Sequence, residues 1–266
     1  MESAIGLVVG VRDGRSYIRS LYTTPPFRVV SVGQLARDSA AYLMQMSTSP
    51  GVLSGDRYQI DVVVESGARL QLKSQSYQRL YDMEHHAEQT ATIDVGDGAH
   101  FSQVAHPIVP HRNSAFYAKS HVTLGVGSSY LQGEIITCGR KHHGEMFEFR
   151  EFSNSVEVRT SDGVLRLRDR VWLSPSSVPL EQLGLLEGFS HQATLIYQST
   201  IVGEEIGVCV DELYDMLSGV EGIEFGVSRT HYTGFVVRAL GMGGEQLFEA
   251  LQSVQAYMWS RCGGDR

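Results

Sequence analysis

Cysteine is scarce in this sequence, which has only Cys138, Cys209 and Cys262 in 266 residues. The odd number, the wide spacing and the lack of a Cys-x-x-Cys pair argue against a disulfide framework or a structural zinc knuckle. No apolar run approaches the roughly 20 residues that cross a bilayer. The N-terminus lacks a basic segment followed by an apolar run, so we expect no signal peptide. These absences predict a soluble cytoplasmic protein.

Basic residues are fewer than acidic ones, at 22 against 30, which gives a net charge of −8. Proteins that bind nucleic acid or anionic membranes normally carry a basic balance or patch, so we expect neither kind of partner. The hydrophobic share of 42% is enough for a substantial core. The acidic balance would not repel a metal cation.

The usual sequence patterns of catalytic sites are also missing. There is no Gly-x-Ser-x-Gly, and Gly241-Met242-Gly243-Gly244 precedes a helical pattern without the Lys-Ser or Lys-Thr of a phosphate-binding loop. The ten histidines include the adjacent pairs His85-His86 and His142-His143. Neighbours on a strand point to opposite faces, and no His-Glu-x-x-His occurs. Structural or solvent-exposed histidines are therefore favoured, and a metal-dependent β-fold enzyme that uses them is the alternative.

What the sequence does contain is a long series of short strand patterns, from Ile5 to about Leu173. In Tyr58–Val64 every second residue is apolar, which is typical of a half-buried strand. Strands that recur about every ten residues predict an all-β sandwich, barrel or β-helix, and periodicity alone does not choose among them. The later predicted strands are Thr90–Val95, Ala99–Ala105, Phe116–Leu124, Ser129–Ile136, Phe147–Phe152, Val156–Arg159 and Val164–Leu173.

The end of the chain has a different pattern, because apolar residues recur there at helical spacing. One stripe runs from Ile206 to Leu217 and another from Leu247 to Met258, with strand patterns before and between them. We expect both stripes to be packing faces rather than recognition helices. The sequence therefore predicts a single mainly β domain, with a body over residues 1–190 and an appended small α/β lobe over residues 191–266.

One loop, Ser47–Asp56, stands out between two strand patterns. Pro50, Gly51 and Gly55 restrict or permit special backbone conformations, and Asp56 ends the loop where the next strand begins. Such a loop could hold a ligand with its carboxylate, or it could simply end a hairpin.

Two further acids, Glu134 and Asp169, lie inside strand patterns. A buried charge is costly unless it is paired. The structural interpretation pairs Glu134 with Arg140 and Asp169 with Arg170, and the functional interpretation makes both acids part of a site.

Several motifs, in this order, resemble urease accessory proteins of the UreD type, also called UreH. The resemblance is firmest from Tyr22 to Leu173, and Ser54 stands where family members often have a glycine before the acid of the loop. The motifs are Tyr22-Thr23-Thr24-Pro25-Pro26-Phe27, Ser49-Pro50-Gly51 through Gly55-Asp56, Ser74-Gln75-Ser76, His106 to Ser114, Gly133-Glu134-Ile135-Ile136 through Gly139-Arg140, Phe147-Glu148-Phe149, Gly188-Phe189-Ser190-His191 and Val237-Arg238-Ala239-Leu240.

This resemblance implies a largely β-helical body with two helices and no catalysis. It implies a complex with a UreF-type accessory protein and, through it, a UreG-type GTPase, docked on urease apoprotein to insert nickel. Nickel(II) would be transient cargo rather than a permanently bound cofactor. By motif match, Asp56, Glu134 and Asp169 fall where the family's nickel passage acids lie.

Separated carboxylates suit such a passage, because thiolate or multi-imidazole sites would trap nickel(II), which ranks high in the divalent affinity order. A purely structural docking scaffold is a further alternative. Exposed aromatic residues and methionine are enriched at interfaces, so Tyr257, Met258 and Trp259 are candidate partner-binding residues.

Overall fold

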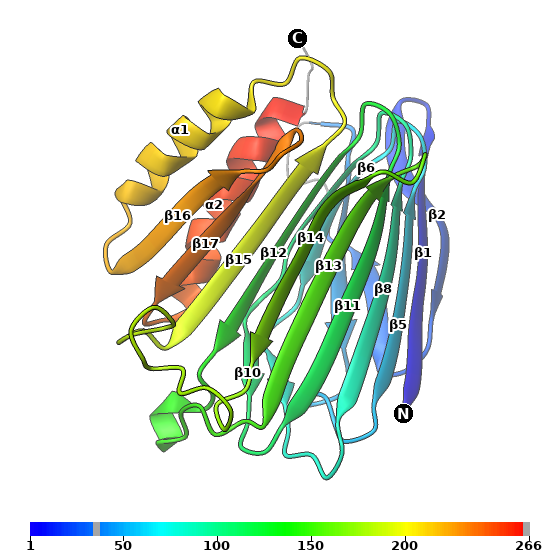
Figure 1. Cartoon of the computed structure of the whole chain (residues 1–266). Coiled ribbons are helices and arrows are strands. Elements are labelled where there is room, and N and C mark those ends of the chain that lie inside the picture. Colours follow the sequence, from blue (N-terminus) through cyan, green and yellow to red (C-terminus); the bar gives the residue numbers. More distant parts are fainter. Residues whose placement is uncertain (34–37, 263–266) are drawn as a thin grey trace.

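Two stacked β-sheets form the body of the protein, and two helices cover one of them (Figure 1). This computed structural model describes residues 1–33 and 38–262. The first sheet has the strand order β14-β13-β11-β8-β5-β1-β2. The second has the main order β16-β17-β15-β12-β9-β6-β4-β3, and it also includes the short strands β7 and β10, which pair with each other and, through β10, with β12. We call them the seven-stranded and the ten-stranded sheet.

The strands of the seven-stranded sheet are β1 (Glu2–Arg12), β2 (Arg15–Thr23), β5 (Arg57–Val64), β8 (Ala87–Val95), β11 (Ala115–Leu124), β13 (Glu151–Thr160) and β14 (Leu165–Leu173). Those of the ten-stranded sheet are β3 (Phe27–Ser31), β4 (Ala41–Ser47), β6 (Arg69–Ser74), β7 (Gln78–Leu80), β9 (His100–Val104), β10 (Ile108–Pro110), β12 (Ser129–Thr137), β15 (His191–Ser199), β16 (Ile223–Arg229) and β17 (Gly234–Gly241). The helices are α1 (Ile206–Ser218), α2 (Gly244–Cys262) and the short 3-10 helix η1 (Lys141–His143).

Between β4 and β13 the chain winds in successive coils. Long strands alternate between the sheets, and each pairs in parallel with strands from the neighbouring coils, as β5 does with β8, β8 with β11 and β6 with β9. This arrangement is β-helical, so the prediction of a mainly β, β-helix-like body with two C-terminal helices is confirmed. Antiparallel strands β2 and β14 close the edges of the seven-stranded sheet.

Every second residue of these strands faces the space between the sheets, because successive side chains on a strand point to opposite faces. The resulting core contains Val62 and Phe116 from one sheet and Phe101 and Tyr130 from the other. Phe101 and Tyr130 stack with ring centroids 5.6 Å apart. The alternating pattern of Tyr58–Val64 is therefore confirmed as a half-buried strand.

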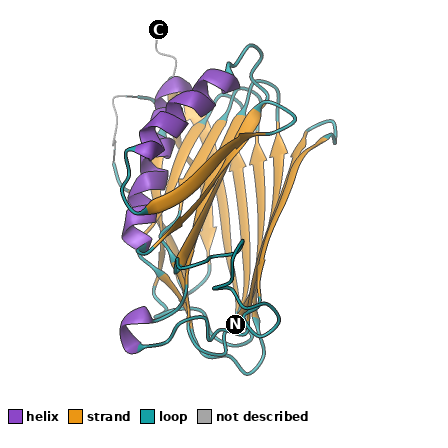
Figure 2. Ribbon diagram, turned by 60° about the vertical axis from the view of Figure 1, so that its left-hand side comes forward, coloured by secondary structure: helices purple, strands orange, loops and turns teal. Residues whose placement is uncertain are grey.

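The helices pack on the outer face of the ten-stranded sheet, and Figure 2 shows both on one side of the molecule. Leu213 and Leu217 of α1 and Leu251 and Val254 of α2 are buried with apolar residues of β12, β15 and β17 in a second core cluster. The predicted stripes are therefore packing faces. Strands β15, β17 and β16 extend the ten-stranded sheet beyond β12. Among the described residues, no helix has the length and hydropathy that a bilayer crossing needs.

Two sequence expectations were wrong in detail. The separate strands predicted for Phe147–Phe152 and Val156–Arg159 are one strand, which begins only at Glu151. Phe147 has a φ of 54°, a left-handed conformation that interrupts an extended chain. The loop Ser47–Asp56 does not end a hairpin, because it carries the chain from β4 in one sheet to β5 in the other.

The C-terminal aromatic residues have partners within the chain. Met258 is buried in the second core cluster, and the Tyr257 hydroxyl donates to Glu212 of α1. The indole nitrogen of Trp259 donates to the Asp38 carboxylate at 3.0 Å and to the Tyr42 hydroxyl at 3.1 Å. The Arg69 guanidinium lies 4.6 Å from the Trp259 ring centroid. Trp259 thus anchors α2 to β4 and β6 of the ten-stranded sheet. A partner-binding role for these three residues stays a prediction.

We predict that Trp259→Phe lowers the free energy of unfolding by about 1–2 kcal/mol, because it removes the indole donor and keeps a ring over Arg69. Urea titration followed by circular dichroism measures the change. Tyr214→Phe on the exposed side of α1 is the control. An unchanged midpoint in Trp259→Phe would contradict the anchoring role.

Candidate functional site

A small polar cavity lies between the sheets, where β12 and β15 face β13 and β14. Its volume is about 20 Å³, which is enough for about one water molecule. It is lined by Gln132, Glu134, Asn154, Val156, Asp169, Val171, Thr194 and Ile196. The structure therefore brings together Glu134 and Asp169, two of the three predicted passage acids.

Glu134 reaches this cavity because it occupies an inward position of β12, two residues before the core residue Ile136. The Asn154 side-chain amide on β13 donates to its carboxylate at 2.6 Å. Burial raises the pKa of the Glu134 carboxyl to about 8, and the Asp169 charge adds to the rise, whereas the Asn154 hydrogen bond opposes it. The side-chain oxygen of Asn154 is buried without a hydrogen-bond partner in the described chain. The cavity thus offers a carboxyl group and a free amide oxygen.

Asp169 enters the cavity from the edge strand β14, opposite Val156 of β13. Its carboxylate pairs with the Arg238 guanidinium of β17, and the same guanidinium donates to the Thr194 hydroxyl at 3.2 Å. This ion pair links the edge of the seven-stranded sheet to the ten-stranded sheet. It also sets one cationic group beside the two acids of the cavity.

The charge partners expected from the sequence are corrected by the structure. Arg140 lies beyond the end of β12, where it pairs with Glu145. It therefore does not reach the inward-facing Glu134 in the middle of that strand. Arg170 follows Asp169 on β14, so the two side chains point to opposite faces of the strand. Neighbours in sequence were poor predictors here because strand geometry separates them.

Asp56 lies elsewhere, at the start of β5, with three strands between β5 and β14 in the seven-stranded sheet. Its carboxylate accepts hydrogen bonds from the Leu53 backbone at 2.9 Å, the Tyr58 hydroxyl at 2.8 Å and the Met1 ammonium at 2.9 Å. Burial raises the pKa of Asp56, but the three donors outweigh it and lower the pKa below its usual value. Asp56 therefore holds the loop closed and does not line the cavity.

A row of inward positions connects the two places. The strand registers align Tyr58 with Gln89, Gln89 with Ala118 and Ala118 with Asn154, across β5, β8, β11 and β13. Tyr58 contacts Asp56 at one end of the row, and Asn154 contacts Glu134 at the other. Ala118 is the smallest member and the only apolar one among these four. The neighbouring row, Ile60, Ala91, Ser120 and Val156, is mostly apolar.

Sequence reasoning missed Asn154 and Arg238 as members of the site. A signal for Asn154 was available, because it interrupts the inward series Phe152, Val156 and Val158 of one strand. The pattern of β17 likewise places Arg238 between Val236 and Leu240 on the inward side. A polar residue at an apolar position of a strand is informative for this reason.

The histidines do not converge in the described part of the chain, where no three His, Cys, Asp or Glu side chains could jointly hold a metal ion. His100 bonds the Ser129 hydroxyl and His191 the Ser190 hydroxyl, each at 2.8 Å. Burial lowers the pKa of both imidazoles to about 4. The convergence that the metal-enzyme alternative requires is therefore missing from residues 1–33 and 38–262.

The raised pKa of Glu134 makes a prediction about stability and pH. Between the ordinary carboxyl pKa of 4.5 and the folded value of about 8, the unfolded chain is ionised while the folded chain keeps its proton. Wild-type stability therefore falls by up to about 1.4 kcal/mol for each pH unit in this window. Glu134→Gln removes this loss, so its stability relative to wild type should increase from pH 4.5 to pH 8 and then level off. Chemical denaturation at several pH values measures it.

The control for this experiment is Glu157→Gln on the outer face of β13. Hydrogen bonds from Arg159 and Arg168 lower the pKa of Glu157, so this variant should not gain stability as the pH rises. A constant difference between Glu134→Gln and wild type across the window would contradict the buried, protonated state of Glu134.

The family described as UreD urease accessory protein matches residues 2–265. A urease accessory protein UreD of Flavobacterium johnsoniae is 44% identical over 259 residues, which covers 97% of this chain and 93% of the relative. The protein of the same name from Acetivibrio thermocellus is 32% identical, with 97% of each chain covered. One from Haemophilus influenzae is 30% identical over 251 residues, with 91% and 93% covered. The chain belongs to the UreD urease accessory protein family.

Proposed function

We propose that this protein delivers nickel(II) into urease apoprotein and is not itself an enzyme. It acts in a complex with a UreF-type accessory protein and, through it, a UreG-type GTPase. Family membership supports a role in urease maturation. The observation that carries the finer proposal is the shared cavity of Glu134 and Asp169, beside an Asn154 oxygen that has no hydrogen-bond partner among the described residues.

The chemistry of this donor set suits transit rather than storage. Two carboxylates and an amide oxygen attract a divalent cation but hold it less firmly than thiolates or several imidazoles do. Glu134 also binds a proton with a pKa of about 8. At neutral pH the cation must therefore displace that proton, which weakens binding and favours release.

Asp56 fits this proposal as the far end of the polar row rather than as a cavity ligand. Its hydrogen bond to Tyr58 joins it to the aligned positions that lead through Gln89 and Ala118 to Asn154. A cation that moves along this row passes the Tyr58 hydroxyl and the side-chain amides of Gln89 and Asn154. The neighbouring row of Ile60, Ala91, Ser120 and Val156 offers only the Ser120 hydroxyl.

The direct test replaces Glu134 with Gln, Asp169 with Asn and Asp56 with Asn, one at a time. Each variant should lower the nickel content of urease matured in cells that express the complete accessory set, while its complex with the UreF-type protein still forms. Metal analysis of purified urease measures the first effect, and co-purification measures the second. Glu157→Gln, which removes a carboxylate from the outer face of β13, should leave both unchanged.

Normal nickel content in all three variants would remove these acids from the mechanism. A purely structural docking scaffold makes a different prediction, because its variants would lose the complex whenever they lose nickel. Nickel loss with the complex intact therefore separates delivery from docking.

The polar row itself can be tested by filling it. Ala118→Leu adds bulk between Gln89 and Asn154 without changing any charge, so we expect a lower nickel content in urease. Ala91→Leu makes the same change in the neighbouring, mostly apolar row and is the matched control. Equal nickel contents in the two variants, at matched thermal stability, would show that the row does not conduct.

A further inference from the structure

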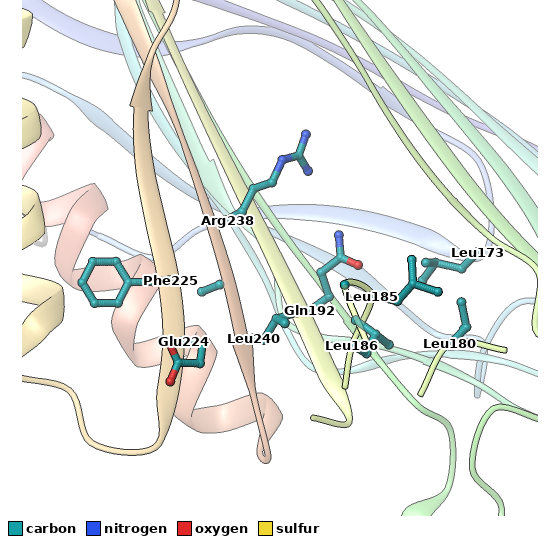
Figure 3. Close-up of a pocket in the computed structure, with 11 residues that line it drawn as sticks. Leu173, Leu180, Leu185, Leu186, Gln192, Glu224, Phe225, Arg238 and Leu240 are labelled. Atoms are coloured by element: carbon teal, nitrogen blue, oxygen red, sulfur yellow. The ribbon is translucent and has the colours of Figure 1, made fainter. Parts of the chain in front are cut away.

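A second, larger pocket adjoins the polar cavity. Its volume is about 440 Å³, and Figure 3 shows leucine side chains on one side of it, with Gln192 and Arg238 projecting from β15 and β17. The leucines come from the end of β14 and from the loop that follows it. They are Leu173, Leu180, Leu185 and Leu186. The pocket forms where the ten-stranded sheet continues past β14, the last strand of the other sheet.

Arg238 lies on the boundary between the two spaces. It lines the large pocket, and its guanidinium pairs with Asp169 and bonds Thr194, both of which line the small cavity. Thr194 and Gln192 are two residues apart on β15, one in each lining. The ion pair therefore stands between the acids of the cavity and the open pocket.

We propose that Arg238 is a gate, which must leave Asp169 before a divalent cation can pass between the cavity and the large pocket. This inference rests on the proposed nickel delivery and adds the residue that controls it. With the pair closed, the guanidinium neutralises Asp169 and repels an approaching cation. With the pair open, Asp169 is free to join Glu134 and Asn154 as an oxygen donor.

The surroundings of Arg238 allow this movement. Its side chain is 47% exposed, whereas that of Asp169 is 16% exposed. A long, half-exposed arginine can therefore swing into the adjoining pocket while the carboxylate stays in place. Asp169 and Glu134 both line the small cavity, so removing Arg238 leaves two acids facing one space.

The test uses the purified full-length chain and nickel(II) as the probe. Isothermal titration calorimetry gives the affinity, and stopped-flow mixing with a chromogenic chelator gives the exchange rate. Arg238→Gln should bind nickel about tenfold more tightly or better and load it faster, because a competing cation is removed from Asp169. Arg238→Lys keeps the charge and should stay near wild type. Arg168→Gln breaks an arginine–carboxylate pair on the outer face of β14 and should also match wild type.

Two more variants keep the test decisive. Asp169→Asn combined with Arg238→Gln should lose the gain, because the freed carboxylate is its source. Thr194→Val removes a hydrogen bond that holds the guanidinium but leaves both charges, so it should accelerate loading by a smaller factor. If Arg238→Gln does not fold, the loading rate of Thr194→Val tests the gate in its place, and an unchanged rate would overturn it.

Unchanged affinity and loading in Arg238→Gln, or an equal gain in Arg168→Gln, would overturn the gate. The proposed function fails separately, through normal urease nickel content when Glu134 and Asp169 are replaced. Loss of nickel content in those variants with no effect at Arg238 would leave delivery standing and remove only the gate.

Discussion

A carboxyl group placed between two apolar sheets is costly unless protons, hydrogen bonds or cations compensate it, and this constraint shapes the centre of the molecule. Glu134 is compensated by a raised pKa and by the Asn154 amide. Asp169 is compensated by Arg238. Each form of compensation is exchangeable, since a proton or a guanidinium can give way to a metal cation. In the proposed function, the cost of burial is the reason that the cavity accepts a cation and releases it.

The β-helical coils determine where such groups meet. Because neighbouring coils pair in register, one inward residue from each strand forms a row across the body, and the character of each row follows from single residues. Tyr58, Gln89 and Asn154 make one row polar, while the row beside it is mostly aliphatic. The unequal width of the two sheets then opens the interior at β14, where Arg238 meets Asp169. Fold and site are therefore two consequences of the same register.

Much of the fold was predictable from the sequence because it depends on local periodicity. The alternation in Tyr58–Val64 and the stripes of the two helices depend only on which face is buried, and both predictions were confirmed. The assignment of strands to sheets was less accessible. The loop Ser47–Asp56 suggested a hairpin from its glycines and proline, yet it joins different sheets, since turn chemistry does not record which strands pair. Phe147 gave no local sign of its left-handed backbone.

The site was predictable only in part, for a related reason. Glu134 and Asp169 stood out as acids in strands, and family resemblance singled them out, but their partners Asn154 and Arg238 come from other strands. Closeness in sequence favoured Arg140 and Arg170 as charge partners of these acids. Strand geometry excludes the pair of Arg170 with Asp169, because adjacent side chains on a strand point to opposite faces. Asp56 was identified as an important carboxylate, and the structure adds that three donors already occupy it. Contacts across sheets require the register, which a single sequence does not contain.

We propose that nickel passes through the space shared by Glu134, Asn154 and Asp169. Anomalous diffraction at the nickel absorption edge, from crystals of the full chain soaked in nickel(II) above pH 8, tests it most directly. The account predicts a peak of partial occupancy within coordination distance of the Glu134 and Asp169 carboxylates. Nickel found only at surface histidines such as His85-His86 and His142-His143, with the cavity empty, would contradict it.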